Sequence, residues 1–121
     1  LKRLWLQGRI DASVGQLDRA ALRLAEAQRG LDEAELGYQA ALAALDLTEV
    51  WLRQGKSKMA AGLVEQAAET FLALGIDREA MGALHLLQQA FEREVATLAV
   101  VQRTIAFFRR FENDPAARFE P

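Results

Sequence analysis

Residues 40–67 join two amphipathic helical segments through one glycine, Gly55, and this arrangement constrains the fold more than any other feature of the sequence. Apolar side chains recur at helical spacing on both sides of Gly55, with charged side chains between them. Small residues, Ala60, Ala61 and Gly62, stand where the second helix must approach the first. Neither helix can bury its apolar stripe alone. The pattern therefore predicts a helical hairpin that packs against further helices.

Composition favours helix along nearly the whole chain. Of the 121 residues, 51% are hydrophobic, only two are proline and none is cysteine. No apolar run approaches the roughly 20 residues that span a bilayer, and no signal-peptide pattern opens the chain, so we expect a cytoplasmic protein without membrane contact. The net charge of −2 argues against a general nucleic-acid binder. The helical pattern is already established at Leu1, which suggests a segment of a longer protein.

Glycines divide the chain into helical segments. Gly15, Gly30, Gly55 and Gly75 each follow an amphipathic run, where a residue free to adopt a left-handed conformation can close a helix. A further break without glycine is expected near residues 95–97. The expected helices are residues 1–14, 16–29, about 32–54, 57–74, 77–93 and 97–112.

The segments repeat at a spacing of forty residues. Gly15 and Gly55 are each followed by alanine after five and after twelve residues. This pattern resembles the tetratricopeptide repeat, which places a large apolar residue before the turn and small residues at the helix contact. The resemblance is clearest in the middle unit, through Leu47, Trp51, Gly55, Ala60, Val64 and Ala67. Residues 5–27 and 77–112 carry weaker copies.

The resemblance implies a fold and a class of protein. The expected fold is all-α, with three antiparallel helical hairpins stacked as a short right-handed solenoid over residues 1–115, followed by a tail at 116–121. Its units are about 1–30, 32–75 and 77–112. The chain is similar to the irregular tetratricopeptide arrays of bacterial regulatory proteins, although its period is forty rather than thirty-four and the closing proline is missing.

Stacked hairpins present the first helix of each unit on a concave groove. A non-catalytic module for protein–protein interaction or scaffolding is therefore the expected function, with a protein or peptide partner, or an attached effector domain. Trp5 could face either the groove or the core. Alignment of the three units predicts which residues line this groove. They are Lys2, Trp5, Arg9, Leu45, Glu49, Arg53, Leu84, Gln88 and Glu92.

Catalysis, a cofactor and a metal site are not expected. His85 is the only histidine, so a two-histidine metal motif cannot form. Asp46 and Glu49 lie one turn apart and could share a face, as acid–base carboxylates do. Neither a nucleophile nor a glycine-rich phosphate loop accompanies them.

The last helix carries two apolar stripes, more than one neighbouring helix would cover. The second stripe is either covered by the tail, through Phe119, or forms a surface for self-association or for docking the rest of a longer chain. Its residues are Val100, Phe107 and Phe111. The same helix is locally basic, and the alternative function is a helical nucleic-acid-binding regulator. That alternative would use Arg103, Arg109 and Arg110.

Overall fold

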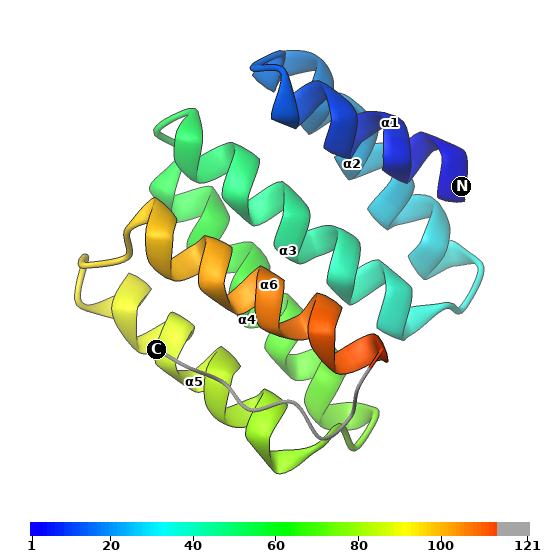
Figure 1. Ribbon diagram of the computed structural model, residues 1–121. Coiled ribbons are helices and arrows are strands. Elements are labelled where there is room, and N and C mark those ends of the chain that lie inside the picture. The colour runs from blue at the N-terminus through cyan, green and yellow to red at the C-terminus, as the bar shows by residue number, and fades with distance from the viewer. Residues whose placement is uncertain (114–121) are drawn as a thin grey trace.

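The computed structural model describes the backbone of residues 1–113 and the side chains of residues 1–110. This part of the chain is all-α, which confirms the expected fold class. The helices are α1 (Lys2–Ser13), α2 (Leu17–Glu33), α3 (Gly37–Arg53), α4 (Ser57–Ala73), α5 (Arg78–Glu92) and α6 (Leu98–Asn113). Each helix packs against the next one along the chain (Figure 1).

The first five helices end in the same turn. At the end of α3, the N–H of Gly55 donates to the carbonyl of Leu52 at 3.0 Å, and the N–H of Lys56 donates to the carbonyl of Trp51 at 2.8 Å. This pair of bonds closes a helix when the residue after the cap adopts a left-handed conformation. The residues with positive φ in these turns are Gly15, Glu35, Gly55, Gly75 and Glu94. The turns therefore recur every 19 or 20 residues, half the spacing of the sequence repeat.

The expected helix end at Gly30 is wrong. Gly30 lies inside α2, which continues to Glu33, and the turn is made by Glu35 with a φ of 59°. A left-handed conformation costs an L-residue about 1–2 kcal/mol, so a glycine elsewhere looked like the better turn residue. Gly30 instead makes room for Leu1: a Cβ atom there would lie 2.5 Å from the Leu1 Cδ2 atom.

Helix α3 is the central element of the fold. It packs against α1, α2, α4 and α6, and in Figure 1 it runs between α1 on one side and α6 on the other. Its sequence explains this position, because small and apolar side chains occupy nearly all of its circumference. The buried residues of α3 are Ala40, Ala41, Leu42, Ala43, Ala44, Leu45, Asp46, Leu47, Thr48 and Val50.

The third hairpin does not follow the expected register. A regular stack would place α5 beside α3, but α5 packs against α4 and α6 and makes no close approach to α3 within the described chain. Helix α6 occupies the place beside α3 instead. Its two apolar stripes explain this, because Phe107 and Phe108 are both buried and α6 must cover α3 as well as α5. Phe108 stacks on Phe71 of α4 with ring centroids 5.0 Å apart.

Helices α1 and α2 approach each other closely at Gly8. A Cβ atom on Gly8 would lie 2.8 Å from the Leu24 Cγ atom and 3.3 Å from its backbone nitrogen. Leu24 is buried in the core and has little room to move. Glycine is therefore required here by the helix contact.

We predict that Gly8→Ala lowers the free energy of unfolding by about 1–3 kcal/mol, the usual cost of overpacking a core, despite the better helix propensity of alanine. The matched control is Gly62→Ala in α4, where a Cβ atom would meet no atom within 4 Å, so the helix contact expected at Gly62 is wrong. This control should raise the free energy of unfolding by about 0.5–1 kcal/mol. Urea denaturation followed by circular dichroism measures both, and equal effects of the two changes would contradict the close contact.

Candidate functional site

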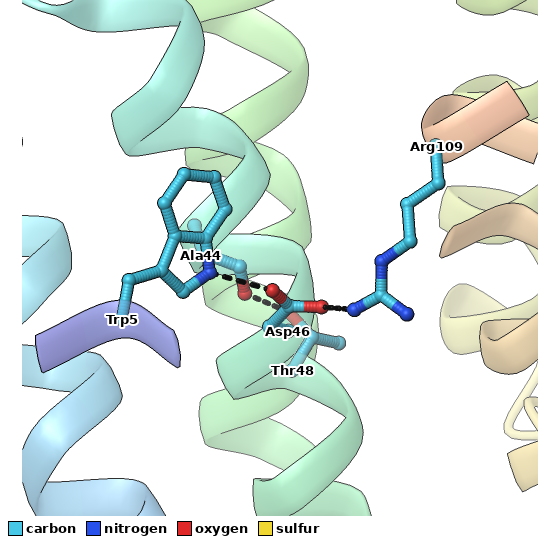
Figure 2. A network of polar contacts seen from close by, with 5 residues as sticks. All are labelled: Trp5, Ala44, Asp46, Thr48 and Arg109. Carbon is cyan, nitrogen blue, oxygen red and sulfur yellow. Dashed lines mark hydrogen bonds and ion pairs between the residues drawn. The ribbon is translucent and has the colours of Figure 1, made fainter. Parts of the chain in front are cut away.

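A buried carboxylate links three helices. Asp46 of α3 accepts a hydrogen bond from the Trp5 Nε1–H of α1 at 2.7 Å and forms an ion pair with the Arg109 guanidinium of α6 at 2.5 Å. Figure 2 shows the two partners approaching Asp46 from opposite sides. Each carboxylate oxygen has its own donor, Oδ2 from Trp5 and Oδ1 from Arg109. Asp46 thereby ties α1 and α6 to the central helix.

The surroundings of Asp46 explain why it needs these partners. The residue is only 7% exposed and lies within an apolar stretch of α3. A buried carboxylate is strongly destabilising unless hydrogen bonds and a counter-charge replace its hydration. The nearby buried Thr48 is satisfied within its own helix, where its hydroxyl donates to the Ala44 carbonyl at 2.8 Å (Figure 2).

Above Asp46 lies a groove with a volume of about 430 Å³, which we call the α1–α3–α6 groove. Helix α1 forms one wall, α6 forms the other, and α3 provides the floor together with Leu24 of α2. The α1 side carries the apolar Leu6, Ile10 and Ala12 together with Arg9 and Ser13, whereas the α3 and α6 sides are polar. The lining residues are Leu6, Arg9, Ile10, Ala12, Ser13, Leu24, Asp46, Glu49, Arg53, Gln102 and Arg109.

The two carboxyl groups of the groove have raised pKa values. Burial raises the pKa of Asp46 above its ordinary value of 3.8, although the charges of Arg109 and Arg9 and the Trp5 hydrogen bond oppose the shift. Burial, and then the neighbouring Asp46 carboxylate, raise the pKa of Glu49 above its ordinary value of 4.5. The charges of Arg53 and Arg109 and a hydrogen bond from Gln102 act in the opposite direction on Glu49. The groove therefore holds two carboxyl groups that lose their protons less readily than they would in water.

Arginines also fix α1 in place. Arg53 of α3 donates from Nη1 to the Ala12 carbonyl at 3.0 Å, at the C-terminal end of α1. A cation is favoured there, because the last carbonyl groups of a helix carry partial negative charge. Asp11 of α1 pairs with Arg23 of α2 at 2.8 Å. Both ends of α1 are thus bonded to its neighbours, Trp5 near the beginning and Ala12 near the end.

The structure brings together three of the residues expected to line a groove, with Trp5 beneath them. Arg9, Glu49 and Arg53 line the α1–α3–α6 groove, and Trp5 lies at its base through its bond to Asp46. Trp5 is partly buried against the core and does not itself line the groove. Lys2 is exposed at the beginning of α1 and does not line the groove.

The remaining expected groove residues lie elsewhere. Leu84 is fully buried in the core, and the other two α5 residues, the half-buried Gln88 and the exposed Glu92, lie away from α3. These three assignments are corrected because α6, and not α5, lies beside α3. Leu45 is also buried, at the bottom of a small cavity of about 60 Å³ beside Trp5.

The sequence-based assignment missed Asp46, Gln102 and Arg109 as members of the groove. The repeat register could not place the two α6 residues, because it assigned that side of α3 to α5. The sequence around Asp46 could have indicated its role. A single acidic residue within an apolar helical run must pair with a cation or with several hydrogen-bond donors when it is buried.

The second apolar stripe of α6, which was expected to be a possible self-association surface, is buried or half-buried where the structure describes it. Phe107 is fully buried and packs edge-to-face on Phe108 with ring centroids 5.6 Å apart, so its assignment to an exposed surface is wrong. Val100 is half-buried against the core. The side chain of Phe111 and the expected covering residue Phe119 lie outside the described residues. The described part of the second stripe therefore belongs to the core.

Other kinds of site find no support in the described residues. His85 is exposed on α5, and within residues 1–110 no group of three potential metal-ligating side chains comes together. No helix of the described chain is long and apolar enough to cross a membrane. Comparisons with protein-family models, with curated proteins and with solved structures found no match. What the groove can bind must therefore be deduced from its own chemistry.

We predict that Trp5→Phe lowers the free energy of unfolding by about 1–3 kcal/mol, because a buried carboxylate loses one of its two donors. The control is Trp51→Phe, at a partly buried tryptophan whose indole donates no hydrogen bond among the described side chains. Both changes remove similar apolar area, so the difference between them reports the bond to Asp46. Equal losses in urea denaturation would contradict a stabilising bond.

The raised pKa values predict how stability depends on pH. As pH rises through the ordinary values of these groups, 3.8 for Asp46 and 4.5 for Glu49, the folded chain holds their protons more tightly than the unfolded chain does, so their contribution to stability falls. Glu49→Gln removes one of the two groups. Relative to the wild type, this variant should therefore gain stability as pH rises above the ordinary Glu49 value of 4.5. Denaturation curves on both sides of this value test the sign, and a constant or opposite difference would contradict it.

Proposed function

We propose that the chain is a non-catalytic interaction module that binds a protein segment in the α1–α3–α6 groove. The observation that carries this proposal is the groove itself, which places exposed apolar side chains beside charged ones over a floor held by buried bonds. Small binding sites combine these properties: a concave shape, an apolar wall and a few placed polar groups. The module acts either as a receptor for a separate partner or as a spacer that docks an attached effector domain.

Leu6 and Ile10 support peptide binding. Both lie on the groove side of α1, and they are 54% and 51% exposed. They are spaced four residues apart, so they form one continuous apolar strip along the helix. A ligand that covered this strip would remove apolar area from water, at about 25 cal/mol per Å². The volume of about 430 Å³ accommodates a few side chains of a peptide.

The bonds of Asp46 favour binding over catalysis. A general acid or base needs a free oxygen that can reach a substrate proton. Both oxygens of Asp46 already accept from protein donors, one from Trp5 and one from Arg109. This leaves Glu49 without the second free carboxylate that paired acid–base chemistry requires.

The position of Arg109 weighs against the nucleic-acid alternative. All three arginines of α6 are exposed, but the guanidinium group of Arg109 points toward Asp46 and is paired with it. The three arginines of α6 therefore do not share one outward surface. A phosphate-binding patch on this helix would rest on two arginines in a chain of net charge −2.

A random-peptide display selection on the immobilised chain tests the proposal. Selected peptides should bind the wild type, and Ile10→Ser should weaken them by about tenfold or more, because it removes apolar contact area from the groove wall. Leu22→Ser is the matched control, since Leu22 is 74% exposed on α2 and does not line the groove. The proposal fails if no peptide is enriched, or if both variants lose binding equally. Tight, salt-dependent binding of duplex DNA with no peptide binding would favour the alternative.

A further inference from the structure

The α1–α3–α6 groove holds more positive than negative charge. Three guanidinium groups, of Arg9, Arg53 and Arg109, face two carboxyl groups, of Asp46 and Glu49. With both carboxyl groups ionised, the groove has an excess of one positive charge, although the whole chain has a net charge of −2. A local reversal of sign inside a concave site concentrates the field and selects ligands of opposite charge.

The excess charge lies toward the open side of the groove. Arg109 is paired with Asp46 at the floor. Arg53 lies near Glu49 and uses Nη1 to bond the Ala12 carbonyl. Arg9 is exposed on the α1 wall and forms no hydrogen bond or ion pair with any described side chain. Its guanidinium group therefore keeps its donors available to a ligand.

Building on the proposed function, we propose that the bound segment presents an acidic side chain to Arg9 and Arg53, with an adjoining apolar side chain against Leu6 and Ile10. The planar donor fork of arginine matches the two oxygens of a carboxylate. The apolar strip lies on the same wall as Arg9, so one short segment can satisfy both. The partner is thus a protein segment that combines acidic and apolar residues.

The charge of the groove favours a carboxylate over a phosphate group. A carboxylate carries one negative charge, which balances the excess of one positive charge. A phosphate group carries about −1.5 to −2 at neutral pH and would face uncompensated repulsion from Glu49. The groove therefore matches the charge of a single acidic side chain.

The two tryptophans allow this proposal to be tested by NMR. The Trp5 indole N–H bonds to Asp46 at the base of the groove, whereas Trp51 lines a separate hollow of about 410 Å³ formed with α2 and α4. The probes are acetyl-Leu-Glu-Leu-amide and its Gln counterpart. The Glu peptide should shift the Trp5 indole resonance and leave that of Trp51 unchanged, and the Gln peptide should bind at least about tenfold more weakly.

A matched pair of variants assigns the effect to Arg9. Arg9→Gln should reduce affinity for the Glu peptide by about tenfold, whereas Arg19→Gln, at an exposed α2 residue that does not line the groove, should leave it unchanged. The proposal is overturned if the Glu peptide fails to shift Trp5 or if both peptides bind equally. It is also overturned if inorganic phosphate shifts Trp5 at lower concentration than acetate does.

The outcome can be separated from that of the proposed function. If peptides from the display selection bind the groove but keep their affinity when each acidic residue is replaced by its amide, acid recognition is disproved and the interaction module stands. If no selected peptide binds and the Glu peptide leaves Trp5 unchanged, both proposals fail. Both proposals are supported if replacing the acidic residue by its amide weakens the selected peptides on the wild type but not on the Arg9→Gln variant.

Discussion

The arrangement of the helices depends on the burial of α3 with one charged residue in its apolar stretch. Almost every side chain from Ala40 to Thr48 is small or apolar, so this helix must be covered on several sides. Asp46 adds a stricter condition, because its carboxylate is stable there only when donors reach it from both flanks. Trp5 and Arg109 meet that condition, and they come from helices at opposite ends of the chain. The same bonds set the base of the groove.

The place of α6 beside α3 follows from these demands. Within residues 1–113, the apolar face of α5 is buried by its contacts with α4 and α6 alone. Helix α6 has apolar side chains on a wider arc, and it alone of the two carries an arginine that can reach Asp46. Its position thus buries Phe107 and Phe108 and also neutralises a buried charge. The two apolar stripes of the last helix are explained by two neighbours within the same chain.

Much of the fold could be predicted from the sequence, whereas the site could be predicted only in part. Glycine turns and helical periodicity are local features, and local patterns determine them. The turn at Glu35 was missed because its left-handed backbone opposes the preference of that residue; the exposed turn is closed by backbone bonds to the Asp32 and Leu31 carbonyls. Arg109 and Gln102 were missed because a repeat register carries no information on a departure from the repeat. The two apolar stripes of the last helix and the need of Asp46 for a cation are the features that indicate this departure.

The bonds that stabilise the fold also keep the groove open. Trp5 and Arg53 attach α1 to α3 near its two ends, and between these points the groove extends along α1 past Leu6, Arg9 and Ile10. Gly8 draws α1 toward α2 on the other side, so α1 does not collapse over α3. Glu49 and Arg53 consequently remain accessible beside a buried ion pair that needs no ligand. A ligand therefore meets a preformed site, and little of its binding free energy is lost in ordering the protein.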